Sequence, residues 1–231
     1  AHAHRLTTIE LSTPVAFLVL FLGLEFCYYW YHRASHTVRW FWATHAVHHS
    51  PNDLTLATSL RLGWTGKLTG NTLIYAPLVW LGFSPAAVLA ALSANLLYQF
   101  WLHPPYIPRL GPLEWILNTP THHKVHHASN EEYLDCNYGG VLIVFDRLFG
   151  TFVDLRADIE IRYGLTTPLT TNNPLKIALH AWIDLGRDLV AARTWMERLE
   201  IVAGPPGGQV GPAQPTAMTA VAAGAEHRAS S

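Results

Sequence analysis

Three short motifs in the first 130 residues place histidines at helical spacing. The motif HRASH separates His32 from His36 by four residues, and the motifs HAVHH and HKVHH each have histidines at positions i, i+3 and i+4. Side chains at these spacings share one face of a helix. A tetrahedral zinc site accepts four ligands, fewer than the motifs supply. The spacing therefore predicts two metal ions, with the candidate ligands His32, His36, His45, His48, His49, His123, His126 and His127.

Other histidines lie outside these motifs. His103, in QFWLH, and His122, beside the third motif, are further candidates for the same site. The remaining four lie at the ends of the chain or in a predicted surface helix, so we assign no role to His2, His4, His180 and His227.

The residues beside the motifs narrow the chemistry. Imidazole binds zinc, copper, iron and nickel, so the ligand type alone does not choose the metal. A zinc hydrolase of the HExxH type needs a glutamate beside the first histidine, where these motifs have Arg33, Ala46 or Lys124. The ExxH pattern of soluble di-iron bundles is also absent from the sequence. The residues favour a redox metal pair that activates dioxygen; a membrane zinc hydrolase and a metal-binding carrier are the alternatives of another class.

The composition is unusual for a soluble domain. The chain has 231 residues, of which 50% are hydrophobic and 13% charged, against about 25% charged in ordinary soluble domains. Its formal net charge of -1 provides no field that would attract a polyanion, which excludes nucleic-acid binding. The composition predicts a chain embedded in a membrane.

Two apolar regions are candidate membrane spans. Residues Pro14 to Tyr31 contain a single charge, at Glu25, and are about long enough to cross a hydrocarbon core. Residues Leu68 to His103 contain no charge and are broken near Gly82, which predicts two helices that cross or nearly cross. Thirteen of the fifteen lysines and arginines lie between residues 33 and 198, so the positive-inside rule places the histidine motifs in the cytoplasm.

The rest of the chain is predicted to lie at the membrane surface. The segment 110–118 predicts a short interfacial helix with Trp115 at the headgroup level. The segment 174–199 predicts an amphipathic surface helix, and Asp146 is interpreted as part of a helix end. We therefore predict an all-α fold, with integral membrane helices and a cytosolic helical cap that holds a histidine-rich dimetal site.

The predicted domain comprises residues 1–203. Residues 204–231 contain no aromatic side chain and are interpreted as a disordered tail. Because the sequence starts at Ala1 rather than Met, we interpret its start as a processed end or a fragment that lacks upstream helices.

Polar residues near the motifs are candidates for orienting the metal ligands. Glu25 precedes His32 by two helical turns, which predicts a hydrogen bond from a ligand ring to its carboxylate. A glutamate that faces the membrane interface is the alternative. Asn118, Asp135 and Asn137 flank the third motif and either orient its rings or cap loops.

The segments EFCYYWYHRASH, WATHAVHHSPNDLTLATSLR and WLHPPYIPRLGPLEWILNTPTHHKVHHASNEEYLDCNYGGVLIVFDRLFGTF resemble the fatty acid hydroxylase and sterol desaturase superfamily. The sequences NTPTHHKVHH, NYGG and DRLFGTF favour its alkylglycerol monooxygenase branch. The resemblance implies a membrane-bound non-haem di-iron enzyme of the endoplasmic reticulum or the bacterial inner membrane. The histidines of the motifs, with His103 and His122, would hold its two iron ions.

The resemblance also implies a reaction. An enzyme of this branch uses dioxygen and tetrahydrobiopterin to hydroxylate the carbon beside the ether oxygen of an alkylglycerol, whose product collapses to an aldehyde and a glycerol. The alternative in the same superfamily hydroxylates or desaturates a sterol, fatty acyl or ornithine-lipid chain, with a ferredoxin or cytochrome as electron donor. Other branches have HxxxH where this chain has Gln99 and His103, which predicts a weaker or water-filled ligand position.

Overall fold

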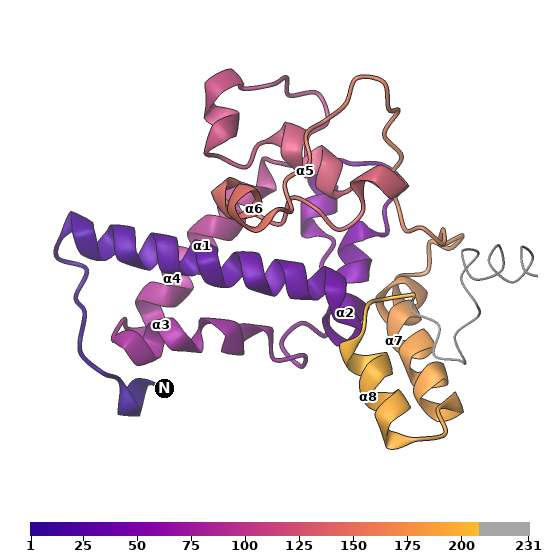
Figure 1. Ribbon diagram of the computed structural model, residues 1–231, viewed down its shortest axis with the longest axis horizontal. Helices are drawn as coiled ribbons and strands as arrows, with labels where there is room; N and C mark the ends of the chain where they lie inside the picture. Colours follow the sequence, from indigo (N-terminus) through magenta and orange to yellow (C-terminus); the bar gives the residue numbers. More distant parts are fainter. Residues whose placement is uncertain (208–231) are drawn as a thin grey trace, which may run out of the picture.

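The computed structural model describes residues 1–207, which fold into helices joined by long loops (Figure 1). Within this range no strand forms, and only three isolated β-bridges are present. The predicted all-α fold class is therefore confirmed. In chain order the helices are η1 (His2–His4), α1 (Pro14–Thr37), α2 (Arg39–His49), η2 (Leu56–Leu60), η3 (Asn71–Tyr75), α3 (Ala76–Leu81), α4 (Pro85–Phe100), η4 (Gly111–Trp115), α5 (Pro120–His126), η5 (Glu131–Tyr133), α6 (Val144–Phe149), α7 (Pro174–Ala191) and α8 (Trp195–Ala203).

Helix α1 combines an apolar segment with the first histidine motif. It starts at Pro14, where the Thr13 side chain accepts a hydrogen bond from the backbone N–H of Ala16. Its 24 residues extend about 36 Å, and it is the one helix among residues 1–207 that is long and apolar enough to cross a membrane. The predicted span ends at Tyr31, but the helix continues to Thr37 and therefore carries both histidines of HRASH.

The predicted break near Gly82 is confirmed, with a helical segment on each side of it, but neither segment is long enough to span a membrane, so that part of the prediction was wrong. The chain there forms η3, the six-residue α3 and the sixteen-residue α4, and the latter two are about 9 Å and 24 Å long. A hydrocarbon core of about 30 Å exceeds both lengths. The break is at Gly82, whose φ of 136° and close approach to the Thr7 carbonyl leave no room for a Cβ atom.

The predicted amphipathic helix 174–199 is two helices. Helix α7 ends at Ala191, and α8 begins after Thr194, whose side chain forms a capping box with Glu197. The pair packs on α2, with Leu185 and Ile201 buried against Ala43 (Figure 1). This contact ties the chain's last described helices to the second histidine motif. Residues 208–231, which include most of the predicted tail and His227, lie outside the described part of the chain.

The segment 110–118 contains a shorter element than predicted. It forms the five-residue 3-10 helix η4, and Trp115 at its end is 69% exposed. The prediction of a helix was right, but it is a single turn that ends at Trp115, after which the Ile116 and Leu117 N–H groups both bond to the Leu113 carbonyl.

We expect Leu185→Ala to loosen the α7–α8 pair. Leu185 is 2% exposed, and truncating a buried leucine costs about 2–5 kcal/mol of stability. Limited proteolysis should cut the variant between α7 and α8 faster than the wild type. The control Leu175→Ala, whose leucine is exposed on the same helix, should cleave at the wild-type rate. Equal cleavage of Leu185→Ala and wild type would contradict the packing described here.

Candidate metal centre

Nine histidines converge into two clusters. In each cluster, one possible ligand atom per residue lies within 4.8 Å of the others. The two clusters also touch each other: the rings of His49 and His127 are stacked, with centroids 4.4 Å apart. The structure thus brings together nine of the ten histidines singled out from the sequence. Cluster one consists of His32, His36, His45, His49 and His126, and cluster two of His48, His103, His123 and His127.

Each HxxHH motif contributes to both clusters. In the second motif, His45 and His49 belong to cluster one, whereas His48 belongs to cluster two. The third motif does the reverse, since its first and last histidines join cluster two and His126 joins cluster one. A helix turns about 100° per residue, so positions i+3 and i+4 deviate to opposite sides of position i. One helical face is therefore wide enough to serve two adjacent sites.

Backbone carbonyls fix the orientation of three rings. In each case the Nδ1 atom lies within hydrogen-bond distance of a carbonyl oxygen, which can only accept. Nδ1 therefore donates, and in the neutral ring the Nε2 atom keeps a lone pair for a metal ion. The pairs are His32 with Tyr138 and His126 with Cys136, both at 2.8 Å, and His103 with Gln99 at 2.9 Å.

The remaining nitrogen atoms point at one another. His103 Nε2 lies 3.1 Å from His123 Nε2 and 3.4 Å from His48 Nε2. Nε2 of His103 has one lone pair and no proton, so it can accept a hydrogen bond from only one of these two rings, and the other contact stays unsatisfied. In cluster one, the Nε2 atoms of His36 and His126 are buried without a hydrogen-bond partner in the described structure. Converging lone pairs repel each other unless a cation lies between them, so both donor sets fit bound metal ions.

The environment keeps these rings neutral. Burial lowers the pKa of His48 to about 3 and that of His103 to about 4. Burial, together with the neighbouring rings, also lowers the pKa of His123, His126 and His127 well below the ordinary value. Neutral imidazole is the form that binds a metal. The clusters are therefore ready to bind metal at pH 7.

His122 was a predicted ligand but lies outside both clusters, with its ring against Phe152, because adjacent residues on α5 point about 100° apart. Gln99 accepts a hydrogen bond from the Tyr28 hydroxyl and donates to Asn95, away from the histidines. That it leaves a weaker or water-filled ligand position stays a prediction.

Glu25 does not bond to a histidine ring, so the prediction of that hydrogen bond was wrong. Its carboxylate accepts hydrogen bonds from the Asn95 side chain and from the backbone N–H groups of Val141 and Leu142, the latter two at 2.8 Å. These donors already occupy both of its oxygen atoms. The side chain is 1% exposed, which also rules out a carboxylate that faces the membrane interface.

The contacts of Glu25 hold the loop that presents carbonyls to the rings. The loop 136–142 is held by hydrogen bonds to two carboxylates. Glu25 accepts from its far end, and Asp146 accepts from the N–H groups of Tyr138 and Gly139 in its middle, at 2.7 and 2.8 Å. Both carboxylates are buried. The two acids therefore act on cluster one indirectly, through the loop. The sequence indicated only a helix end at Asp146, since no local spacing relates this residue to residues 138 and 139.

Of the other residues predicted to orient the rings, one contacts a ring and two contact the backbone. Asp135 Oδ1 lies 3.5 Å from His36 Nδ1, the one carboxylate–ring contact among the described cluster residues. Asn118 donates to the carbonyl of Gly139, and Asn137 donates to the carbonyls of His122 and Val153. These two asparagines brace the loop and helix α5 rather than the rings.

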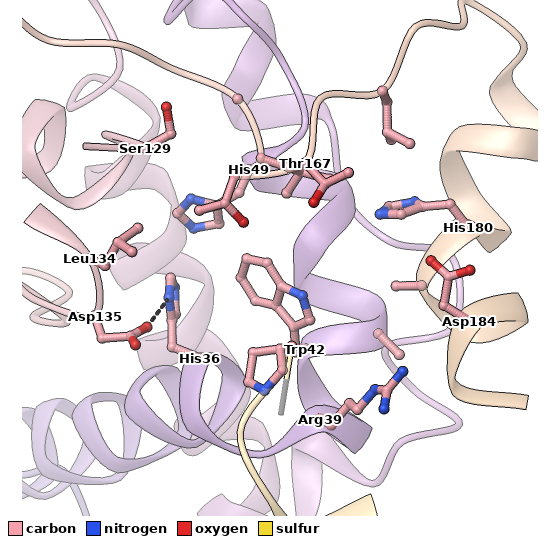
Figure 2. Close-up of a pocket in the computed structure, with 18 of the residues that line it drawn as sticks. His36, Arg39, Trp42, His49, Ser129, Leu134, Asp135, Thr167, His180 and Asp184 are labelled. Atoms are coloured by element: carbon pink, nitrogen blue, oxygen red, sulfur yellow. Dashed lines mark ion pairs between the residues drawn. The ribbon is translucent and has the colours of Figure 1, made fainter. Parts of the chain in front are cut away.

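A cavity of about 380 Å³ opens onto cluster one (Figure 2). His36 and His49 form one side of it, and His180 and Asp184 of α7 form the other. The indole of Trp42 lies between the two sides. His180 is not a member of either cluster, but the structure places it beside the cavity. No sequence pattern indicates this cavity, because α2 and α7 are more than a hundred residues apart.

These features define a helical protein with two adjoining histidine clusters, each able to hold a metal ion. The family model for fatty acid hydroxylases matches residues 17–151, and the chain belongs to the fatty acid hydroxylase family. The resemblance drawn from the motifs is thus confirmed. No solved structure matches the chain.

The similar proteins include alkylglycerol monooxygenases. Those of Xenopus tropicalis and Homo sapiens are 39% and 40% identical to this chain, in each case over 92% of the chain and 46% of the relative. An ornithine lipid hydroxylase of Rhizobium tropici is 36% identical over 60% of the chain and 43% of the relative. The chain therefore spans about half the length of the curated relatives it matches.

We expect Asp146→Asn to weaken metal binding at cluster one more than at cluster two. The amide has one acceptor oxygen in place of two, so the loop that carries the Tyr138 and Cys136 carbonyls is no longer fixed. Loss of such outer contacts costs about 10- to 100-fold in metal affinity. A chelator titration of the purified protein should resolve one weakened ion and one near wild type. Asp53→Asn, at an exposed aspartate, is the control. Equal weakening of both ions would contradict the role given to this loop.

Proposed function

We propose that this chain forms the metal centre of a membrane-bound non-haem di-iron monooxygenase that hydroxylates a lipid C–H bond. The observation that carries the proposal is the pair of adjoining histidine clusters with neutral, inward-facing nitrogen atoms. Membership of the fatty acid hydroxylase family supports the reaction class. We further propose that nine histidines, His122 excepted, are the ligands.

An alkylglycerol is the proposed substrate, on the basis of the relatives named for it. Two bound iron ions would supply the reduction of dioxygen coupled to oxygen insertion into the C–H bond. The C–H bond and an electron donor provide two electrons each; one oxygen atom enters the lipid, and the other leaves as water with two protons. Hydroxylation beside the ether oxygen then gives an aldehyde and a glycerol. By resemblance, the proposed donor is tetrahydrobiopterin.

The chain's own residues hold the reacting centre together. The carbonyls of Tyr138 and Cys136 keep His32 and His126 in one tautomer, with Nε2 free for the metal. Asp135 Oδ1 lies 3.5 Å from His36 Nδ1, and its negative charge would favour a metal ion at this ring. Trp42 packs against the rings of His36 and His49, which restricts their rotation.

The position of helix α1 supports a lipid substrate. Its first two thirds expose apolar side chains such as Phe17, Leu18 and Phe26, and its last turns carry two cluster histidines. A lipid in the membrane around α1 would therefore lie close to the metal centre. We propose that this end faces the cytoplasm, in a bacterial inner membrane or the endoplasmic reticulum, and that residues 1–203 form one domain.

An ornithine-lipid chain is the second candidate substrate, because the relative from Rhizobium tropici bears that name. A zinc hydrolase is less well supported. It would need a carboxylate aimed at a metal-bound water, whereas Asp135 contacts ring nitrogen and Glu25 and Asp146 bond to the loop. A metal carrier would not need the loop that fixes the rings.

We expect two metal ions per chain, one in each cluster. A substitution in one cluster should remove only the ion of that cluster. Elemental analysis of the detergent-purified protein should find about two ions in the wild type and in His122→Ala. His36→Ala should lose the ion of cluster one and His103→Ala that of cluster two, since each removes one donor from a single set. A wild-type protein that saturates at one ion would refute the dimetal assignment.

The reaction is tested with membranes that contain the full-length protein. They are incubated with an alkylglycerol, a sterol, a fatty acid and an ornithine lipid under isotopically labelled dioxygen and tetrahydrobiopterin. We expect a labelled fatty aldehyde, trapped by reduction to the alcohol, from the alkylglycerol alone. His36→Ala should abolish it, while Asp158→Asn should not. Label only in hydroxylated ornithine lipid would establish the second candidate, and no label in any lipid would exclude a monooxygenase.

A further inference from the structure

Three aromatic rings connect cluster one to the surface of the protein. The ring centroids of His36 and Tyr138 are 5.3 Å apart, those of Tyr138 and Tyr29 6.1 Å, and those of Tyr29 and Trp30 5.4 Å. Tyr138 and Tyr29 are 1% and 0% exposed, whereas Trp30 is 37% exposed and has the Arg33 guanidinium over its ring. The rings of Tyr138, Tyr29 and Trp30, here called the aromatic path, therefore lead from a metal ligand to a charged part of the surface.

The hydroxyl group of Tyr29 belongs to a chain of hydrogen bonds with a fixed direction. It accepts from Arg33 Nη1 at 3.1 Å and lies 2.9 Å from the hydroxyl oxygen of Thr151. Thr151 donates its single hydroxyl proton to Asp146 Oδ1 at 2.7 Å, so it accepts from Tyr29. Only one hydroxyl group thus separates the phenol proton of Tyr29 from a buried carboxylate.

Asp146 is suited to take up that proton. Burial raises the pKa of its carboxyl group to about 6, while hydrogen bonds from Thr151 and from the backbone of Tyr138 and Gly139 limit the rise. The group is therefore ionised at pH 7, yet it binds a proton more readily than an ordinary aspartate does. One-electron oxidation makes a phenol strongly acidic, so a base within reach of the hydroxyl group makes the oxidation easier.

Tyr28 is the other tyrosine of α1 beside cluster one, with its ring centroid 5.4 Å from that of His32. Its hydroxyl group donates to the side-chain oxygen of Gln99 at 2.7 Å. A neutral amide oxygen is a much weaker base than a carboxylate, and it has no proton of its own to pass on. Tyr29, whose proton can reach Asp146, is consequently the easier of the two to oxidise.

We propose that Tyr29 is a redox-active tyrosine, which supplies electrons to the metal centre when no lipid is bound. The inference rests on the proposed monooxygenase function, in which the C–H bond provides two of the four electrons that dioxygen needs. Without lipid, Tyr29 would give these two electrons one at a time through the ring of Tyr138, and two protons from the solvent would complete the reduction to water. At each step the phenol proton would move through Thr151 to Asp146 and leave a neutral tyrosyl radical. A water-soluble one-electron reductant of the ascorbate class would reduce this radical through Trp30, and Asp146 would return the proton.

The aromatic path would protect the metal centre from its own oxidising power. Without a C–H bond to attack, an oxidised centre takes electrons from the side chains around it, and thiols are among the most easily oxidised. Cys136 is buried beside cluster one, and its carbonyl holds the ring of His126. Electrons supplied by Tyr29 would spare these residues.

Hydrogen peroxide is the probe, because it is dioxygen already reduced by two electrons and needs two more, with two protons, to give water. The iron-loaded full-length protein is mixed with peroxide in the absence of lipid and frozen rapidly for EPR spectroscopy. We expect a tyrosyl signal that narrows with ring-deuterated tyrosine and is lost in Tyr29→Phe. Thr151→Val should lower the signal several-fold, because the phenol proton loses its path. The matched control is Tyr133→Phe, at an equally buried tyrosine whose hydroxyl group also accepts a hydrogen bond; it should keep the wild-type signal.

Peptide mass spectrometry then shows where oxidation accumulates after repeated additions of peroxide. In the wild type, oxygen should be incorporated at Trp30 more than at Trp64, although Trp64 is 65% exposed. In Tyr29→Phe, the oxidation should move to Cys136 and the ligand histidines, with the iron content unchanged before peroxide is added.

The outcomes separate this proposal from the proposed function. Absence of a tyrosyl signal in the wild type, or an equal signal in Tyr29→Phe, would overturn the redox role, even in a protein that hydroxylates lipid. Equal oxidation of Trp30 and Trp64 would overturn the aromatic path. A Tyr29 radical in a protein that oxygenates no lipid would refute the proposed function and leave the redox site standing.

Discussion

The structure depends on one electrostatic constraint, which is the convergence of nine imidazoles at the centre of the protein. Most of these rings are buried, and pairs of their Nε2 atoms lie 3.0 to 3.4 Å apart. Such an arrangement is unfavourable in an apolar interior unless a positive charge lies among the nitrogens. Helices α1, α2 and α5 and the end of α4 meet at this point. The packing around it consequently serves to hold rings in one orientation.

The contacts that hold the rings are of two kinds, direct and indirect. Backbone carbonyls fix ring tautomers directly, and the buried carboxylates of Glu25 and Asp146 fix the loop that carries two of those carbonyls. Hydrogen bonds to charged acceptors are stronger than those between neutral groups. Removing one partner of such a bond therefore costs more stability. Helix α1 takes part in both tasks, because it carries Glu25 within its apolar segment and His32 and His36 at its end.

Local spacing was sufficient to predict the helices that carry the motifs and the gathering of their histidines. The apolar run that starts at Pro14 also predicted the start of α1. Spacing did not show that Glu25 bonds to residues more than a hundred positions away, because such partners depend on tertiary packing. The same reason applies to Asp146 and to His180 beside the cavity. The break before α8 did have a local signal, the Thr194–Glu197 capping box, which the apolar periodicity of the segment concealed.

The crossed contribution of the two HxxHH motifs has a consequence for assembly. Because α2 and α5 each provide ligands to both clusters, neither site can be completed while one of these helices is out of register. The first ion to bind would fix the rotation of both helices and so pre-arrange the donors of the neighbouring cluster, at a smaller ordering cost. The first ion would then assist the second, although a substitution that disturbs one cluster would still weaken the ion of that cluster most.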